Sequence, residues 1–214
     1  MITISAFKWV PPFAQGLVRD LRVRWALEEA GLSYQVKLID RADQRSAEYR
    51  AYQPFGQVPY FEEDGLVLFE SGSIVLHVAE RSATLLPADR GARARAITWI
   101  FAALNTIEIA AEQLAEIDLF YPDQEWAKLR RPDAEKGMRR RLRELATRLG
   151  DREYLDGAFT AGDLMMTTVL RTLRHTELLE AEPSLKAYKA RCEARPAFQK
   201  ALAAQLAAFE RREA

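Results

Sequence analysis

Gln53-Pro54-Phe55-Gly56-Gln57-Val58-Pro59 is a turn-rich stretch that leads into the apolar pair Tyr60-Phe61, the start of a predicted strand. A proline has no backbone N–H, so at the entry to a strand it belongs at an edge, at the first position or after a cis bond. A cis bond between Val58 and Pro59 would leave the N–H and C=O of Val58 facing outward. An extended, peptide-like ligand would then pair with these groups as an added strand, recognised by main-chain hydrogen bonds rather than by side-chain identity.

Two polar residues mark the start of the next helix. Glu70-Ser71 ends the apolar run Leu66-Val67-Leu68-Phe69 and precedes a helical pattern of apolar residues that begins at Ile74. Ser71 is placed as the N-cap of that helix, since a serine hydroxyl accepts a hydrogen bond from an N–H of the first turn. The unpaired N–H groups of a helix start attract anions, so this end is a predicted site for a ligand carboxylate.

The first 82 residues alternate predicted strands and helices. Strands are predicted at 2–7, 34–39, 58–62 and 66–69, helices at 16–30 and 71–82, and a short helix or irregular segment at 43–52. The sequence Glu63-Asp64-Gly65 predicts a hairpin, because glycine supplies the positive φ of a tight turn. The order βαβαββα predicts an α/β fold, a mixed sheet with helices on its faces. We therefore expect a first domain at 1–82.

Every periodic segment after Pro87 is helical. The stretch 83–90 contains this proline and is a predicted linker. Helices are predicted at 91–117, 124–149, 160–179, 183–194 and 196–209, so that 91–214 forms a second, all-α domain. Thr160 and Asp163 have the spacing of a capping box, and both are interpreted as folding residues rather than catalysts.

The composition disfavours several classes of function. Lys plus Arg and Asp plus Glu both total 31, so no net field attracts nucleic acid or an anionic membrane. Cys192 is the only cysteine, which excludes an intramolecular disulfide and fits a reducing compartment. The two histidines have no partners at metal-ligand spacing, so no metal site is predicted. We find neither a signal-peptide pattern nor an apolar run of membrane-spanning length, and expect a soluble cytoplasmic protein.

The motifs together resemble one known family. The Val58-Pro59 pair, the Glu70-Ser71 pair and the capping stretch Phe159-Thr160-Ala161-Gly162-Asp163-Leu164 occur in the order and at the spacing of cytosolic, bacterial-type glutathione S-transferases. The resemblance covers essentially the whole chain. It implies the glutathione transferase fold, in which a thioredoxin-like N-terminal domain precedes an all-α C-terminal domain.

The resemblance also implies a ligand site and a reaction. Glutathione would be the cosubstrate, and its thiolate would attack an electrophilic carbon of a hydrophobic small molecule, as in detoxification by homodimeric transferases. The binding residues implied by the family are Gln57 for the glycyl carboxylate, Val58 and Pro59 for the cysteinyl part, and Glu70 and Ser71 for the γ-glutamyl group. No metal takes part.

The group that would activate the thiol departs from the family pattern. A thiol with a pKa near 8.5 is mostly protonated at neutral pH, and relatives use a Tyr, Ser or Cys near the first helix to favour the thiolate. Residues 6–32 contain no Ser, Thr, Cys or Tyr, and Ser5 is expected within the first strand, facing the sheet. Arg19, in the first turn of the predicted helix, is the first candidate, followed by Lys8 and the indole N–H of Trp9. A cation lowers a thiol pKa by favouring the anion.

Other interpretations stay open. Arg19 and Lys8 also fit solvated surface residues, and Trp9 also fits a packing residue that covers a sheet end. The missing hydroxyl favours, as a rival, a non-catalytic binding or assembly module with the transferase fold. A glutathione-dependent reductase or isomerase is a third reading, against which the absence of a cysteine between residues 9 and 20 counts.

Overall fold

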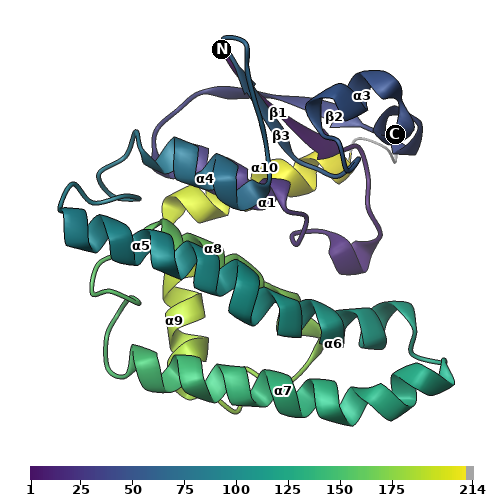
Figure 1. Cartoon of the computed structure of the whole chain (residues 1–214), viewed down its shortest axis with the longest axis vertical. Helices are drawn as coiled ribbons and strands as arrows, with labels where there is room; N and C mark the ends of the chain where they lie inside the picture. Colours follow the sequence, from purple (N-terminus) through teal and green to yellow (C-terminus); the bar gives the residue numbers. More distant parts are fainter. Residues whose placement is uncertain (211–214) are drawn as a thin grey trace. The chain divides into compact units, whose positions relative to one another are not determined.

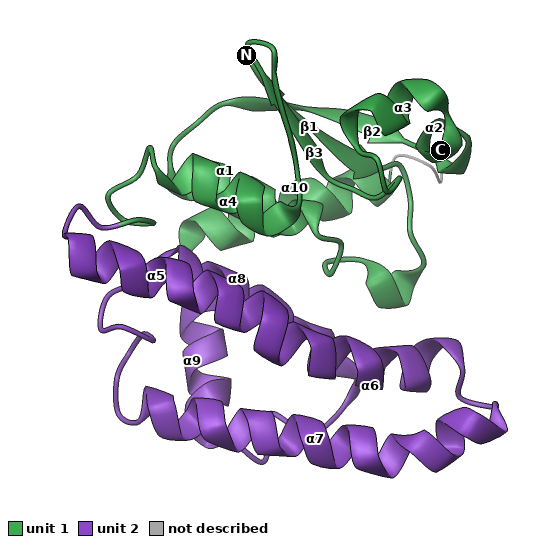
Figure 2. Cartoon of the chain, viewed as in Figure 1, with its two compact units in different colours: residues 1–86, 195–214 green, residues 87–194 purple. Residues whose placement is uncertain are grey.

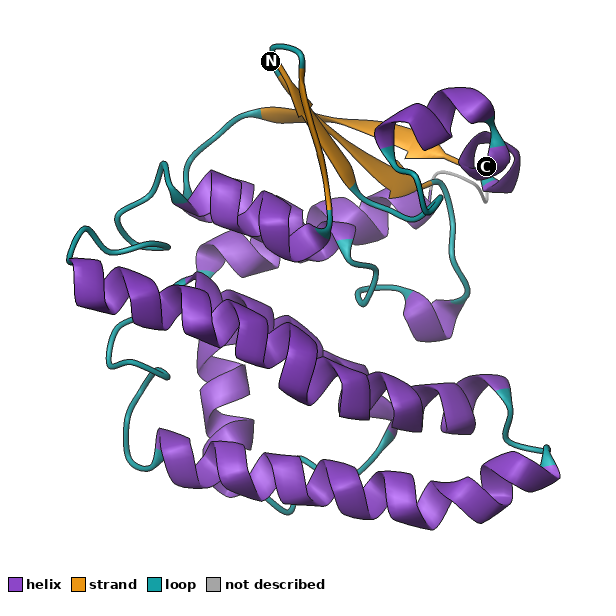
Figure 3. Ribbon diagram, viewed as in Figure 1, coloured by secondary structure: helices purple, strands orange, loops and turns teal. Residues whose placement is uncertain are grey.

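β1 is one of the two interior strands of the sheet in the structure, a computed structural model that describes residues 1–210. The strands are β1 (Ile2–Phe7), β2 (Tyr34–Ile39), β3 (Tyr60–Glu63) and β4 (Leu66–Phe69). β1 pairs in parallel with β2 and antiparallel with β3, and β3 pairs antiparallel with β4, which gives the order β2-β1-β3-β4 (Figure 3). Ile4 is fully buried, as expected for a strand covered on both faces. The predicted mixed sheet is confirmed.

The helices between the strands follow the predicted order with shifted starts. They are η1 (Pro12–Ala14), α1 (Asp20–Glu29), α2 (Arg41–Arg45), α3 (Ala47–Tyr52) and α4 (Ser71–Ala79). α1 starts at Asp20 rather than at the predicted Gly16, because Gly16 has a φ of 76°, outside the helical region. α1 and α4 lie side by side next to the sheet (Figure 1).

The last helix, α10 (Pro196–Glu210), belongs to the same compact unit as the sheet. This unit comprises residues 1–86 and the chain from Arg195, and the second comprises residues 87–194 (Figure 2). The division differs from the expected domain at 91–214. Helical periodicity predicts that α10 exists but not what it packs against.

Specific contacts tie α10 to α1. Arg195, just before α10, donates to both carboxylate oxygens of Glu29 at 2.6 and 2.8 Å. The rings of Trp25 and Phe198 meet edge to face with centroids 4.8 Å apart, a favourable aromatic geometry. The sheet unit is therefore completed by the end of the chain.

The second unit is helical throughout residues 87–194. Its elements are α5 (Arg90–Ala102), the π-helical segment η2 (Ala103–Glu108), α6 (Ile109–Phe120), α7 (Glu125–Leu149), α8 (Ala161–Arg171), the 3₁₀ turn η3 (Thr172–His175) and α9 (Pro183–Glu193). The helix predicted at 160–179 ends as a 3₁₀ turn at His175, because Thr176 is extended. The capping box of Thr160 and Asp163 is present, and both residues are buried. Their predicted folding role agrees with this geometry.

One helical run among the described residues is long and apolar enough to cross a membrane by length and composition. Residues 90–120 form this run of 31 residues, with a mean hydropathy of 1.2 and 33% burial in its most apolar window. Core helices of globular proteins pass the same test, and this run belongs to the helical unit.

Candidate functional site

The Val58-Pro59 pair has its main chain free beside the sheet. The peptide bond between the two residues is cis, as predicted. The Val58 side chain lies in a buried cluster with Ile39, Tyr49 and Tyr60, and Val58 is only 7% exposed. β3 begins at Tyr60, so Val58 lies before the ladder, and within residues 1–210 neither its N–H nor its C=O has a hydrogen-bond partner. An anchored residue thus presents an unpaired donor and acceptor.

The start of α4 lies at the same end of the β-hairpin. Tyr60 is opposite Phe69 in the β3–β4 ladder, so Val58, just before β3, and Glu70, just after β4, leave the sheet together. No side-chain hydrogen bond caps α4, and within the described part of the protein the N–H groups of Ser71–Ser73 have no partner. Unpaired helix N–H groups attract a carboxylate. The two predicted parts of the binding site are therefore neighbours.

The sequence predicted Ser71 as the N-cap of α4, and this prediction is wrong. The N-cap is Glu70, with φ 70° and ψ 114°, and Ser71 is the first helical residue. The Ser71 hydroxyl instead accepts a hydrogen bond from Nη1 of Arg22 at 3.2 Å, and both side chains are buried. A positive φ at a non-glycine residue costs on the order of 1–3 kcal/mol and is common at binding sites. It turns the exposed Glu70 away from the strand path at the helix entry.

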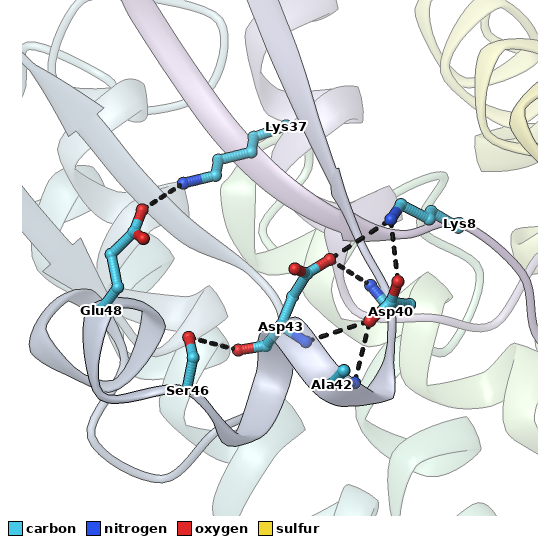
Figure 4. Close-up of polar contacts among 7 residues, drawn as sticks. All are labelled: Lys8, Lys37, Asp40, Ala42, Asp43, Ser46 and Glu48. Carbon is cyan, nitrogen blue, oxygen red and sulfur yellow. Dashed lines mark hydrogen bonds and ion pairs between the residues drawn. The ribbon is translucent and has the colours of Figure 1, made fainter.

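Lys8 is held by two carboxylates. Its ammonium group lies 2.9 Å from Oδ2 of Asp40 and 3.3 Å from Oδ2 of Asp43 (Figure 4). Asp40 is also the N-cap of α2 and accepts from the backbone N–H groups of Ala42 and Asp43 at 2.8 and 3.0 Å. The hydrogen bonds from Lys8 to the two carboxylates raise the pKa of Lys8. Lys8 thus stabilises the start of α2, and the carboxylates of Asp40 and Asp43 balance its positive charge.

Trp9 and Lys8 line a cavity of about 980 Å³ in the sheet unit. It lies at the carboxyl ends of the parallel strands β1 and β2, where α/β proteins commonly bind ligands. Apolar side chains dominate the lining, which is formed by Phe7, Lys8, Trp9, Val10, Pro11, Leu38, Ile39, Asp40, Arg41, Ala42, Gln44 and Ala208. Trp9 is 42% exposed. Neither Arg19 nor the predicted glutathione-binding residues belong to this lining.

Arg19 lies immediately before α1, with helical backbone angles, and its side chain makes no capping hydrogen bond. It is partly buried. The next residue, Asp20, is fully buried and binds Arg24 at 2.7 Å and Gln205 at 2.6 Å. Burial is the main cause of the raised pKa of Asp20. The start of α1 therefore already has an acidic group, and Arg19 is the cation beside it.

Comparison with known proteins points to one family. A family model described as "Glutathione S-transferase, N-terminal domain" matches residues 15–80. Glutathione S-transferase 4 of Zea mays is 29% identical over 208 residues, which cover 92% of this chain and 91% of the maize protein. This chain is similar to glutathione S-transferases over nearly its whole length.

Solved structures of glutathione transferases share the fold of this chain. A glutathione transferase from Burkholderia graminis, with two glutathione molecules bound per subunit, has a TM-score of 0.80 at 26% identity, covering 94% of this chain and 87% of that one. A family member from Pseudomonas fluorescens pf-5 has a TM-score of 0.82 at 24% identity, covering 94% and 92%. The expected transferase fold is confirmed.

Two residues that the sequence did not single out contact the candidate glutathione site. Arg22 bonds to Ser71, and the hydroxyl of Tyr49 donates to the backbone carbonyl oxygen of Gln57 at 2.6 Å. Ser5 lies buried within β1, as expected, 2.8 Å from the Tyr49 hydroxyl. Sequence spacing carries no signal for such long-range pairs. Among the described residues, no group of His, Cys, Asp and Glu side chains is arranged to hold a metal ion.

Proposed function

We propose that the protein binds glutathione and conjugates its thiol to an apolar electrophile. The observation that carries this proposal is the adjacency of the unpaired Val58 main chain and the unpaired start of α4 at one end of the hairpin. Together they offer a strand-like edge and an anion site to one short peptide. Glutathione has a peptide middle and a free α-carboxylate, and similar glutathione transferases bind it.

Each binding residue has a distinct part in this proposal. Val58 pairs with the cysteinyl part of glutathione through its N–H and C=O, and Pro59 follows in the cis form. The Ser71 hydroxyl and the first-turn N–H groups of α4 take the γ-glutamyl carboxylate, and the exposed Glu70 carboxylate takes the ammonium group. The exposed Gln57 side chain donates to the glycyl carboxylate.

The reaction forms one carbon–sulfur bond. The thiol proton leaves to solvent, and the thiolate attacks the electrophilic carbon. In a substitution that carbon expels its leaving group with the bonding electron pair; in an addition the displaced electron pair moves to another atom of the electrophile, which takes up a proton from solvent. Arg19 is the proposed activating cation, because it is a partly buried guanidinium immediately before α1 and a nearby cation favours the thiolate. Lys8, held by Asp40 and Asp43, is the second candidate. Trp9 lines the cavity and gives it an apolar wall, and its indole N–H is the proposed further donor to the sulfur. That cavity is the proposed site of the hydrophobic cosubstrate.

A homodimer in the cytoplasm is the proposed state of the protein. β4 is an edge strand whose Leu66, Val67 and Phe69 are 43%, 37% and 38% exposed. Phe55 is 65% exposed and its ring meets that of Phe69 at 6.0 Å. An apolar sheet edge of this kind favours a partner over solvent. A neutral protein with one buried cysteine fits the cytoplasm.

The rival function is glutathione binding without turnover. It is favoured by one observation, the absence of Ser, Thr, Cys and Tyr from residues 6–32. A protein of this kind would use the same clamp and leave the bound thiol protonated. The single cysteine does not support a reductase or isomerase function, because Cys192 is buried in the helical unit and residues 9–20 of the sheet unit contain no cysteine.

One titration separates these functions. Glutathione is added to the purified protein, thiolate absorbance in the ultraviolet is followed across pH, and calorimetry on the same sample counts the sites. A transferase shows saturable binding with thiolate present at neutral pH. Binding with the thiol still protonated supports the rival, and absence of binding contradicts both.

A further inference from the structure

A series of hydrogen bonds through two buried side chains leads from the sheet to the peptide bond in front of Val58. The N–H of Tyr60 donates to Oγ of Ser5 at 2.8 Å, and Oγ of Ser5 lies 2.8 Å from the hydroxyl oxygen of Tyr49. The Tyr49 hydroxyl in turn donates to the C=O of Gln57 at 2.6 Å. Ser5 is 0% exposed and Tyr49 is 3% exposed, whereas the bond to the exposed Gln57 is partly buried.

The chemistry of the groups fixes the direction of every proton in this series. A carbonyl oxygen only accepts, so the Tyr49 hydroxyl proton must point to Gln57. The Tyr49 oxygen is then free to accept the hydroxyl proton of Ser5, and the Ser5 oxygen accepts the N–H of Tyr60. Donors aligned head to tail polarise one another, and each bond strengthens the next. We call the two side chains, Ser5 and Tyr49, the relay.

The relay acts on the Val58 N–H through peptide planarity. The bond between Gln57 and Val58 is trans, so the C=O of Gln57 and the N–H of Val58 point in opposite directions from one rigid plane. The Tyr49 hydroxyl holds the C=O on one side. The N–H is therefore directed to the opposite side, where it has no partner among residues 1–210.

We propose that Ser5 and Tyr49 are positioning residues that aim and polarise the Val58 N–H for the main-chain acceptor of glutathione. This inference rests on the proposed function. A hydrogen bond to the C=O of an amide makes its own N–H a stronger donor. Loss of the Tyr49 hydroxyl should therefore weaken glutathione binding about five- to tenfold, the size of one net hydrogen bond.

Tyr49→Phe and Tyr52→Phe form a matched pair of variants. Both tyrosines are on α3 and pack against Tyr60, with centroids 5.6 and 5.0 Å from its ring. Within the described residues, the Tyr52 hydroxyl has no hydrogen-bond partner. The Lys37 ammonium lies over the Tyr52 ring at 5.9 Å, a contact that phenylalanine keeps. Of these two variants, only Tyr49→Phe breaks the relay. A third variant, Ser5→Ala, removes the hydroxyl that donates to Tyr49.

Two readouts are needed on each variant. The first, without ligand, is the carbonyl ¹³C resonance of Gln57, which reports the hydrogen bond that it accepts. The second is the glutathione affinity by calorimetry, with KM and kcat where turnover exists. We expect Tyr49→Phe to move the resonance upfield and to raise Kd and KM about five- to tenfold, with kcat little changed. Ser5→Ala should show a smaller change in the same direction, and Tyr52→Phe none.

Each other outcome has a definite meaning. A moved resonance with unchanged affinity overturns the proposal, and so does an unmoved resonance in Tyr49→Phe. Equal loss of affinity in both phenylalanine variants would show a packing effect and also overturns it. Failure of the wild-type protein to bind glutathione rejects the proposed function and with it the relay's role in binding, whereas a moved resonance in that case still establishes the geometry. Thermal unfolding of each variant confirms that it is folded.

Discussion

Arg22 of α1 donates a hydrogen bond to the hydroxyl of Ser71 at the first position of α4, at 3.2 Å, and the two residues are only 4% and 6% exposed. A buried guanidinium beside an uncapped helix start places a positively charged group next to the partial positive charge of the N–H groups. The two together make the end of α4 a stronger site for a carboxylate than the helix alone. Ser71 is thus set as a ligand donor by a residue from another helix.

The first prediction concerns this pair. Arg22→Met should weaken glutathione binding about tenfold or more, because a hydrogen bond to a charged group contributes about 1.5–3 kcal/mol. kcat should change little. Isothermal calorimetry and KM measurements test this, and the double variant with Ser71→Ala should lose little more affinity than Arg22→Met alone. Fully additive losses would show that Arg22 does not act through Ser71.

Arg19 is tested by the pKa of the bound thiol. Removing a nearby cation disfavours the thiolate, so Arg19→Ala should raise the pKa of bound glutathione by about one. Ultraviolet titration of the thiolate in the complex measures this value. The matched control is Arg45→Ala, since Arg45 is an arginine at the end of α2 that does not line the cavity. An unchanged thiol pKa in the Arg19 variant would refute its assigned role.

The ion pair of Lys8 and Asp40 gives a prediction for acid solution. The pKa of Asp40 is lowered to about 2, first by the backbone N–H of Asp43 and then by Lys8. A lowered carboxyl pKa means that the stabilisation by Asp40 is present above its ordinary value of 3.8 and is lost as the pH falls through about 2.

Lys8→Met should therefore raise the pKa of Asp40 only part of the way to 3.8, because the larger cause remains. An NMR titration of the Asp40 carboxyl carbon measures the change. Lys37→Met removes a similarly exposed ammonium paired with Glu48 at 3.4 Å and should leave Asp40 unaffected. A full return of the Asp40 pKa to its ordinary value in the Lys8 variant would show that the helix cap contributes nothing.

Gly162 in the first turn of α8 has no room for a side chain. A Cβ there would lie 2.4 Å from Cβ of Trp99 and 3.1 Å from the C=O of Ala96, both on α5. Gly162→Ala should therefore lower the free energy of unfolding by about 1–3 kcal/mol, the usual size of overpacking. Gly137→Ala, in α7 with nothing within 4 Å, should instead raise it by up to about 1 kcal/mol. Urea unfolding of both variants decides between these signs.

Local patterns in the sequence were sufficient for much of the fold. Alternation and turn residues predicted the strands and the hairpin at Asp64-Gly65, and proline chemistry together with the family resemblance predicted the cis bond before Pro59. The pair Glu70-Ser71 was placed correctly at the start of a helix, but the N-cap is Glu70. The non-helical backbone angles are those of Glu70, and the Ser71 hydroxyl accepts from Arg22, which is distant in sequence.

The parts that the sequence did not reveal depend on partners that are distant in sequence. The bond from Tyr49 to Gln57 requires the α3 helix to return to the loop before β3, and Ser5 reaches Tyr49 only through the sheet. In the same way, the packing of α10 on α1 depends on tertiary contacts that periodicity does not encode. The sequence also predicted Lys8 as an activating cation, but it could not show that Asp43 of α2 and Asp40, the N-cap of α2, pair with the Lys8 ammonium group.

The return of α10 to the sheet unit sets an order of events on the ribosome. All strands are translated early, yet the helix that supplies Phe198 against Trp25 and Gln205 against Asp20 is translated last. The helical unit can finish folding while the ligand-binding unit still waits for its final piece. A premature stop codon before α10 would thus leave the helical unit of residues 87–194 complete and the sheet unit without its last helix. Ligand binding by the sheet unit therefore requires synthesis of the chain through α10.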